Sequence, residues 1–506
     1  MRDLLQIQAT PTAENAAIRL HPDDNIAIAR VPLDQGSFIH IDEINLRTLG
    51  AIPAGHKIAL RDIAAGENVI RYGCSIGTAS IRIAAGSHVH THNLTFVPAG
   101  ELSAMSPDER PLPSPPPRVP SFMGYAREDG RAGTRNYVAI AAVSNCAAHV
   151  SQQIAAHFAN RSLPPGVDGV VAFPHGEGCG HSIGPDTRQL HRVISGVMQH
   201  PNVGAGLLIG LGCEVNQISE YPALAGLTLQ ENGGTRATVQ EGVRQVEALL
   251  EQAAEVPRTP VPVSKLVLGL NCGGSDSFSG ISANPALGSC VDRLVALAGT
   301  AVLAETTEIF GAESLLLNRA RNPEVARKLI ACVQAYRAYL ARFGGSFDDN
   351  PSPGNKQGGL TNIVEKSLGA VAKGGTAILA EVVDYAERIP ALPGLVFMNT
   401  PGYDPVSLTG LAAGGVNVIA FTTGRGSAIG FPTVPVLKIS SNTSIYDRMR
   451  ENIDVNAGGI MDGSATVSEV GQVIFDRLLE VASGTQTSSE RLGHQEFVPW
   501  RIGPVL

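Results

Sequence analysis

The chain has 506 residues, of which 43% are hydrophobic and 17% are charged, and its formal net charge is −8. This length predicts two to four domains, and this composition excludes a disordered or fibrous protein. The sequence has no run of basic residues and only 5% aromatic residues, so we expect no nucleic-acid partner.

No secretory signal and no apolar run of about 20 residues is visible, which predicts a cytoplasmic protein without a membrane partner. Seven cysteines stand at wide spacings. In a reducing compartment such cysteines are thiols or metal ligands rather than disulfides.

Residues 1–100 are predicted to form a small all-β domain. Short apolar strands alternate with three turns of similar sequence that each contain a glycine, as in a meander of hairpins. The segment ends in HVHTHN, and alternation places His88, His90 and His92 on one face of a strand. These histidines either bind a metal or form a polar strand face.

Residues 101–120 are rich in proline, which predicts an extended linker without a ladder or helix. From residue 121 onward, apolar strands alternate with helical segments, as in an α/β protein with a parallel sheet. The PSPGN loop at 351–355 predicts two halves of this parallel-sheet region, residues 121–350 and 351–506. The expected strands are 137–144, 169–173, 204–210, 265–270, 300–305, 376–383, 394–398, 416–423 and 434–439, and the expected helices include 289–298, 312–319, 323–342 and 464–483.

Four cysteines each follow the carboxyl end of a predicted buried strand: Cys146, Cys179, Cys213 and Cys272. Such strand ends lie along one edge of an open parallel sheet, where ligands bind, so the four thiols are expected to converge. A thiolate set of this kind suits iron or an iron–sulfur cluster. A single cysteine of this kind is more often a small buried hydrophobe, and the context that all four share favours a site.

The loop after Cys272, NCGGSDSFSGISAN, combines a glycine pair with several hydroxyl groups. Loops of this type bind anions through backbone N–H groups and hydroxyls. Ser275, Asp276 and Asn284 are therefore candidate binding residues.

Other loops supply candidate cations and proton-transfer groups. Asn355 and Lys356 lie in PSPGNKQGG and Arg425 lies in TTGRGSAIG, where a cation amid glycines suits a carboxylate ligand. Glu305 and His175 lie at predicted strand ends and are candidate acid or base groups. For each of these residues alone, a solvated loop side chain is the alternative.

At these motifs the chain resembles the altronate dehydratase and galactarate dehydratase family. The resemblance is carried by DGRAGTRN, HGEGCG, IGLGCE, NCGGSDSFSGISANPALG, PSPGNKQGG, FTTGRG and DVNAGGI. IPAGHKIAL, VIRYGCSIG and HVHTHN resemble the SAF, or β-clip, domain of that family. HVHTHN, GAESLL and NPSPGNK favour an altronate-type enzyme, whereas SAIGFPTVP departs from the Thr-Pro-Tyr-Gly run that the family usually shows.

The resemblance implies a hydro-lyase that removes water from a 2,3-dihydroxy acid to give a 2-keto-3-deoxy acid, assisted by iron as Fe²⁺ or an iron–sulfur cluster. It also implies a homo-oligomer. Alternatives are a galactarate dehydratase, a sulfolactate sulfo-lyase and a sugar-acid-binding protein without catalysis.

The resemblance also implies roles for the candidate residues. Cys146, Cys179 and Cys272 would bind the iron, with Cys213 as a candidate fourth ligand. Lys356 and Arg425, with Asn355, would hold the substrate carboxylate, and Ser275, Asp276 and Asn284 would hydrogen-bond the polyol. The base would be His175, Glu305, or His90 or His92 carried over the pocket by a β domain acting as a lid.

Overall fold

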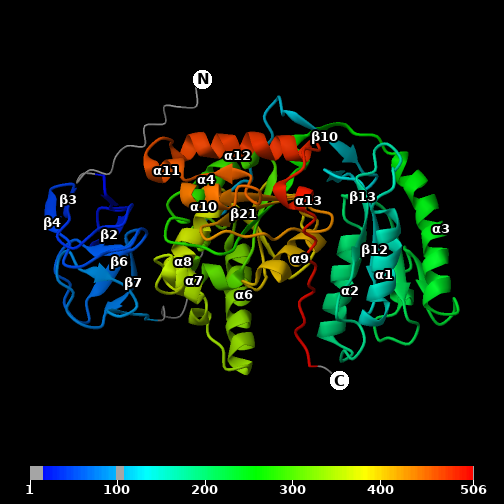
Figure 1. Cartoon of the computed structure of the whole chain (residues 1–506), viewed down its shortest axis with the longest axis horizontal. Helices are drawn as coiled ribbons and strands as arrows, with labels where there is room; N and C mark the ends of the chain where they lie inside the picture. Colours follow the sequence, from blue (N-terminus) through cyan, green and yellow to red (C-terminus); the bar gives the residue numbers. More distant parts are fainter. Residues whose placement is uncertain (1–14, 98–106, 505–506) are drawn as a thin grey trace.

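The computed structural model describes residues 15–97 and 107–504. It consists of a β domain, a central α/β domain and a smaller α/β domain (Figure 1). The central domain lies between the other two (Figure 1). The predicted fold class, α/β with a small all-β domain in front, is confirmed.

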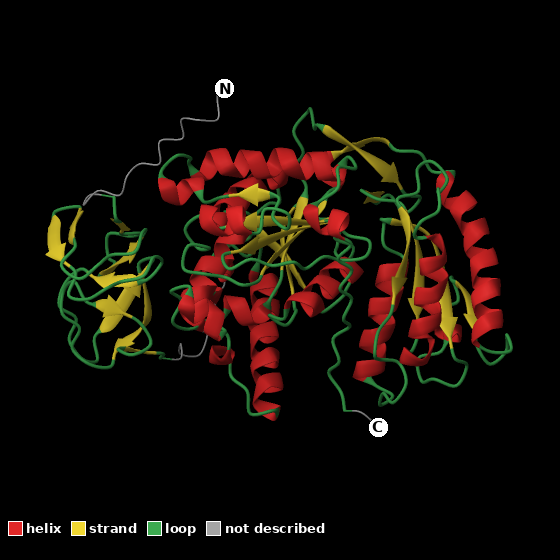
Figure 2. Cartoon of the chain, viewed as in Figure 1, coloured by secondary structure: helices red, strands yellow, loops and turns green. Residues whose placement is uncertain are grey.

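The β domain contains strands only, as Figure 2 shows. Its three antiparallel sheets have the orders β1-β2-β5-β8, β3-β4 and β6-β7-β9. The predicted glycine turns are confirmed, since Gly55, Gly66 and Gly86 have φ of 82°, 82° and 80°. The strands are β1 (Ala17–Ile18), β2 (Ile26–Ala29), β3 (Phe38–Ile41), β4 (Ile44–Arg47), β5 (Lys57–Ala59), β6 (Asn68–Arg71), β7 (Cys74–Ala79), β8 (His88–Val89) and β9 (Leu94–Thr95).

The predicted histidine strand is shorter than expected, because β8 ends at Val89 and a turn follows. Asn93 causes the turn. Its side-chain oxygen accepts from the His90 N–H at 2.9 Å and its amide donates to the His88 carbonyl at 2.9 Å. The histidines therefore gather around a turn instead of alternating along a strand.

The proline-rich segment has neither helix nor strand in its described part, residues 107–120, as the linker prediction requires. Residues 101–106 of the predicted linker, and residues 1–14 and 98–100 of the predicted β domain, lie outside the described residues. After it, β10 (Ser121–Ala126) pairs with β11 (Ala132–Gly133) and with β16 (Thr259–Pro262).

The smaller α/β domain has one parallel sheet of order β13-β12-β14-β15. The helices α1 (Asn145–Phe158) and α3 (Thr235–Ala254) cover one face, while α2 (Pro185–Met198) packs against α9 (Asp404–Gly414) of the central domain. The strands are β12 (Tyr137–Ala142), β13 (Gly169–Phe173), β14 (Val203–Gly210) and β15 (Ala225–Thr228).

The central domain is built on a seven-stranded parallel sheet of order β19-β20-β18-β17-β21-β22-β23. Its strands are β17 (Val267–Cys272), β18 (Thr300–Leu303), β19 (Leu379–Val383), β20 (Gly394–Met398), β21 (Val418–Thr423), β22 (Val436–Ser440) and β23 (Val455–Asn456). Its longer helices are α4 (Ala283–Ala296), α6 (Pro323–Arg342), α8 (Ile363–Ala370), α9 and α12 (Val467–Ala482), and its short ones are α5 (Glu313–Leu317), α7 (Pro353–Gln357), α10 (Thr443–Arg448), α11 (Gly459–Asp462) and α13 (Ser488–Leu492).

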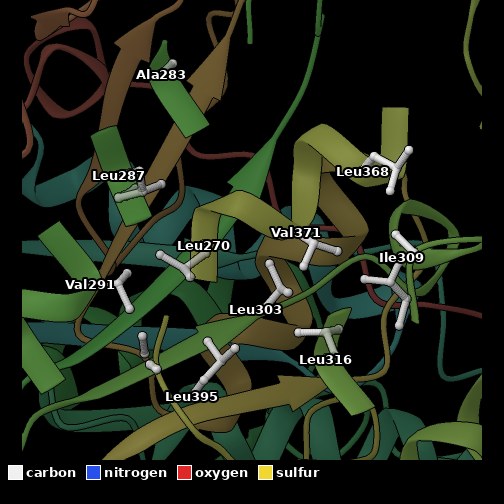
Figure 3. Close-up of a cluster of buried hydrophobic side chains, with 14 of the residues drawn as sticks. Leu270, Ala283, Leu287, Val291, Leu303, Ile309, Leu316, Leu368, Val371 and Leu395 are labelled. Carbon is white, nitrogen blue, oxygen red and sulfur yellow. The ribbon is translucent and has the colours of Figure 1, made fainter. Parts of the chain in front are cut away.

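Buried aliphatic side chains hold the helices on this sheet (Figure 3). Leu270, Leu303 and Leu395 from three neighbouring strands pack with Leu287 and Val291 of α4. Burial of each such side chain contributes about 1.5–3 kcal/mol. This packing gives a firm base to the carboxyl ends of the strands, where the site residues lie.

All nine predicted strands and all four named helices are confirmed, but the predicted division at 351–355 is wrong. The boundary between the two parallel sheets lies between β15 and β17. Strands on both sides of residue 351 belong to the seven-stranded sheet. The PSPGN segment resembles a domain boundary because it is rich in residues that form turns. In the structure, Pro351 and Pro353 of this segment line a cavity.

Among the residues that the structure describes, none of the helices combines the length and the hydropathy needed to cross a bilayer.

Candidate functional site

A cavity of about 800 Å³ opens between the β domain and the central domain. This volume is within the range of small-molecule sites. The lining side chains include both cations and carboxylates. From the β domain they are Pro53, His56 and His90, and from the central domain Asp348, Asp349, Pro351, Pro353, Lys356 and Gln357.

Four histidines gather in the β domain, and two of them, His56 and His90, line this cavity. His56 Nδ1 lies 2.9 Å from His88 Nε2, and the ring centres of His56 and His90 are 4.8 Å apart. His92 is exposed and lies 5.3 Å from His88, ring centre to ring centre. Burial lowers the pKa of His88 to about 4 and that of His90 to about 3, so both imidazoles are neutral at pH 7.

A buried ion network joins the β domain to α8 of the central domain. Lys57 Nζ lies 2.9 and 3.0 Å from the two carboxylate oxygens of Glu365, and Arg71 contacts the same carboxylate. All three side chains are fully buried. Burial alone would raise the pKa of Glu365, but Lys57 and Arg71 lower it to about 2.

Separating the two domains would break these contacts and leave buried charges without partners, which costs several kcal/mol. The expectation of a β domain that moves as a lid on its linker therefore does not fit this structure. The β domain is a fixed wall of the cavity.

The loop after β17 is held by its own polar side chains. Asp276 accepts hydrogen bonds from Ser279 and Ser441 at 2.8 Å each. Asn284 accepts from Thr422 at 2.7 Å and donates to the Gly369 carbonyl at 3.0 Å. Asp276 and Asn284, predicted to bind substrate, are occupied in shaping the loop.

A much smaller cavity lies behind this loop and measures about 10 Å³. Cys272, Ser275 and Asp276 are among its lining residues. A single water needs about 10–15 Å³ of such space, so a sugar acid does not fit there. The hydroxyl of Ser275 has no partner among the described residues.

The Cys272 thiol lies in a buried cluster of ionisable groups. Its sulfur lies 2.8 Å from Glu308 Oε2, 3.5 Å from Glu305 Oε2 and 2.8 Å from Lys373 Nζ. Lys373 also donates to Glu305 at 3.1 Å, and Lys366 Nζ lies 2.5 Å from Glu308 Oε1. Three acidic groups and two cations thus share one buried region.

Glu305 is the unusual member of this cluster. Burial raises its pKa to about 7, and the neighbouring Glu308 adds to the effect. Its backbone has φ 73°, a left-handed conformation that is rare for a residue other than glycine. Such strain and such a shift are typical of functional positions.

The other three predicted thiols lie at a different sheet. Cys146, Cys179 and Cys213 follow the neighbouring strands β12, β13 and β14 of the smaller α/β domain, and all three are exposed. Burial and the neighbouring Cys179 raise the pKa of Cys146. The expected convergence of four thiols at one edge is wrong, because Cys272 follows a strand of the seven-stranded sheet.

His175 lies in the smaller α/β domain and its imidazole is fully engaged by the backbone. Nε2 lies 2.7 Å from the Ala142 carbonyl and Nδ1 accepts from the Glu177 N–H at 3.1 Å. Burial lowers its pKa to about 4. Neither nitrogen is left for a substrate, so the predicted role of His175 as a base does not fit this geometry.

The predicted carboxylate ligands have different environments. Lys356 lines the large cavity, and exposed Arg425 contacts Gln357 at 3.5 Å. Asn355 closes the capping box of α7 with Ser352 and donates to the Ser275 carbonyl at 2.8 Å. Lys356 and Arg425 are free to contact a ligand, whereas Asn355 holds the loops together.

Several residues of the site were absent from the sequence prediction. The contact of His56 with His88 could not be predicted, because His56 lies in a turn 32 residues before His88. Glu365, Lys366 and Lys373 are charged groups within the apolar stretch IVEKSLGAVAKGG, which was the available sign that they are buried.

Comparison with protein families gives three matches that cover most of the chain. Residues 15–96 match the altronate/galactarate dehydratase SAF domain. Residues 124–254 match the second domain of D-galactarate dehydratase/altronate hydrolase, and residues 263–505 match the D-galactarate/altronate dehydratase C-terminal domain.

Curated relatives agree with these matches. An altronate dehydratase of Escherichia coli is 35% identical over 97% of this chain and 99% of its own length. A galactarate dehydratase (L-threo-forming) of the same organism is 36% identical over 98% of both chains. The β subunit of a (2R)-sulfolactate sulfo-lyase of Chromohalobacter salexigens is 34% identical over 76% of this chain and 97% of its own length.

Proposed function

Because the chain belongs to the D-galactarate/altronate dehydratase family, we propose that this carbon–oxygen lyase dehydrates an altronate-type aldonic acid in the cavity between the β domain and the central domain. The observation that carries the proposal is the combination, in one cavity of about 800 Å³, of neutral imidazoles and the Lys356 ammonium. A sugar acid needs both a cation for its carboxylate and groups that accept or donate protons.

Lys356 and Arg425 hold the carboxylate in this proposal. The carboxylate becomes more negative as the proton leaves the neighbouring carbon, so cations stabilise the developing enediolate more strongly than the substrate. Exposed Arg425 is placed by Gln357, its neighbour across the rim of the cavity.

In this proposal His92 accepts the proton from the carbon next to the carboxylate and returns it to the departing hydroxyl group, which leaves as water. It is the exposed member of the histidine group, and imidazole is the side chain that most often serves as a general base. His90, the other β-domain histidine predicted for this role, is packed against His56.

We infer that the iron expected from the sequence binds in the smaller α/β domain. Cys146, Cys179 and Cys213 follow adjacent strands, and the Gly178 carbonyl joins two of their loops by accepting from the Asn216 N–H at 3.0 Å. We propose that these three thiols hold an iron–sulfur cluster. When bound, such a cluster supplies an iron that lacks a cysteine ligand and is a Lewis acid. The smaller domain and the β domain lie on opposite sides of the central domain, so no step in the cavity is assigned to that iron (Figure 1).

The test is a substrate screen with purified protein. Altronate, galactarate and sulfolactate are supplied separately, and 2-keto-3-deoxy product or released sulfite is measured. Turnover of altronate that is at least tenfold faster than that of the others, and is lost in His92→Asn, supports the proposal. Faster turnover of galactarate or sulfite release would overturn the substrate assignment, and full activity of His92→Asn would overturn the proton acceptor.

A further inference from the structure

The three imidazoles of His56, His88 and His90 form a group whose potential ligand nitrogens all lie within 4.8 Å of one another. The nitrogens of two ligands on one tetrahedral or octahedral ion, each about 2.1 Å from it, lie about 3.0–3.4 Å apart. The 2.9 Å between His56 Nδ1 and His88 Nε2 is close to that spacing.

Hydrogen bonds fix which nitrogen of His56 is available. Its Nε2 lies 3.1 Å from the Gln357 carbonyl, which only accepts, so Nε2 carries the proton. Nδ1 of His56 therefore presents a lone pair towards His88. A histidine that ligates a metal usually donates its other N–H to a carbonyl in this way.

His90 completes the group. Its Nδ1 is buried and has no partner among the residues that the structure describes. A buried polar atom of this kind is costly unless it meets a ligand. The turn that carries His88 and His90 is already fixed by both ends of the Asn93 amide, so little reorganisation is needed.

The surroundings leave room on one side only. The central domain closes the group through the Gln357 carbonyl, whereas His56 and His90 border the large cavity. Asp348 and Asp349 line the same cavity, so among its described lining residues two carboxylates outnumber the one ammonium, that of Lys356. Lys57, the nearest cation in the β domain, is paired with Glu365.

We propose that His56, His88 and His90 bind one divalent transition-metal ion whose open positions face the cavity. Neutral imidazoles suit zinc, iron, nickel and copper, and three protein ligands leave room for oxygen ligands. The existence of the site depends on the imidazole geometry alone. Its task rests on the proposed function: the open positions would take the carboxylate and a hydroxyl of the sugar acid.

The test uses the full chain after removal of metals with a chelator. Co²⁺ is titrated and followed by its d–d absorption, which reports nitrogen ligands, and by the thiolate-to-cobalt band, which reports the cysteine sites. In addition to any Co²⁺ that the exposed thiols Cys146, Cys179 and Cys213 bind with a thiolate band, we expect one equivalent of Co²⁺ with nitrogen ligands and no thiolate band. His88→Ala and His90→Ala should each weaken this binding by about 100-fold, while His40→Ala, in the β3–β4 hairpin of the same domain, should not change it.

Crystals grown with Co²⁺ then locate the ion by anomalous scattering. A peak among the three imidazoles that disappears in His88→Ala supports the site. Cobalt found only beside Cys272, Glu305 and Glu308, or binding that is unchanged in both histidine variants, would overturn it. Circular dichroism of each variant checks folding, and His90→Ala serves as the second variant if His88→Ala is unfolded.

Failure of the site and failure of the proposed function are distinguishable. If Co²⁺ binds to the imidazoles but none of the sugar acids is dehydrated, the site stands and the function fails. If His88→Ala dehydrates altronate at the full rate and the unaltered protein shows no cobalt peak among the three imidazoles, the function stands and the site fails.

Discussion

Both parallel sheets place cysteines just beyond the carboxyl ends of their strands, yet the surroundings of these thiols are opposite. In the smaller α/β domain Cys146, Cys179 and Cys213 are exposed and stand on three adjacent loops. In the central domain Cys272 is buried between carboxylates and the Lys373 ammonium. Cysteines at the same position after a strand are therefore accessible thiols in one sheet and part of a buried cluster of charged groups in the other.

The difference arises from what covers each edge. The central edge is closed by α8 and the following turn, which supply Lys366 and Lys373. The edge of the smaller domain carries short loops that leave its thiols open to solvent. The buried groups around Cys272 must pair their charges, because an unpaired buried charge is costly. The three exposed thiols are instead accessible to a ligand.

The largest effect is expected when the cation of the buried cluster is removed. Lys373→Met leaves Glu305 and Cys272 without their ammonium partner, and loss of one member of a buried ion pair costs about 3–5 kcal/mol. Urea unfolding, followed by the fluorescence of Trp500, the single tryptophan, measures the loss in the central domain.

Lys328→Met is the matched control, because Lys328 pairs with Glu381 at 2.9 Å on the surface with 43% of its side chain exposed. A surface pair of this type contributes about 0–1 kcal/mol. Equal effects of the two substitutions would remove the distinction between the buried cluster and an ordinary ion pair.

The next effect concerns activity in the large cavity. Lys356→Met removes the ammonium that faces the proposed carboxylate, and a hydrogen bond to a charged group is worth about 1.5–3 kcal/mol. The kcat/KM for the sugar acid should fall about 10–100-fold with no change in urea unfolding. Lys356→Arg should restore part of it. An unchanged kcat/KM in Lys356→Met would show that the substrate binds elsewhere.

A smaller effect is expected in the pH dependence of stability. The folded-state pKa of Glu305 is raised from the ordinary value of 4.5 to about 7, so the folded protein holds this proton more tightly than the unfolded chain. The stability that this proton contributes is present below pH 4.5 and is lost as the pH rises towards 7.

The free energy of unfolding should decline between pH 4.5 and pH 7, and Glu305→Gln should make this decline smaller by about 1–3 kcal/mol. Urea unfolding at several pH values in this window measures the difference. Exposed Glu324→Gln is the control, and its profile should match that of the unaltered protein. A Glu305→Gln profile that also matches would mean that Glu305 is ionised throughout the window.

Local features such as strands and turns could be predicted from the sequence. Contacts that depend on how the strands are arranged in the sheets could not. Apolar runs bounded by turns predicted nine of the eleven strands that the structure describes in the two parallel sheets, and the glycine turns of the β domain were predicted correctly. The sequence does not predict which strand belongs to which sheet, because Cys213 and Cys272 both follow short apolar runs that look alike in sequence. Lys373 is 101 residues from Cys272 and His56 is 32 residues from His88, so only the fold brings these pairs together.

The smallest change in stability and the sharpest contrast between the two sheets are expected for Cys213→Ser. Cys213 is exposed and its thiol accepts one long contact, 3.4 Å, from Gln230. Stability should therefore change by less than about 0.5 kcal/mol. If three thiolates hold the proposed cluster, protein purified without oxygen should nevertheless lose its iron and acid-labile sulfide in this variant. Cys74→Ser, in the β domain, is the control and should keep both. Iron that is kept in Cys213→Ser but lost in Cys272→Ser would place the metal at the buried thiol, because only that substitution would then remove a ligand.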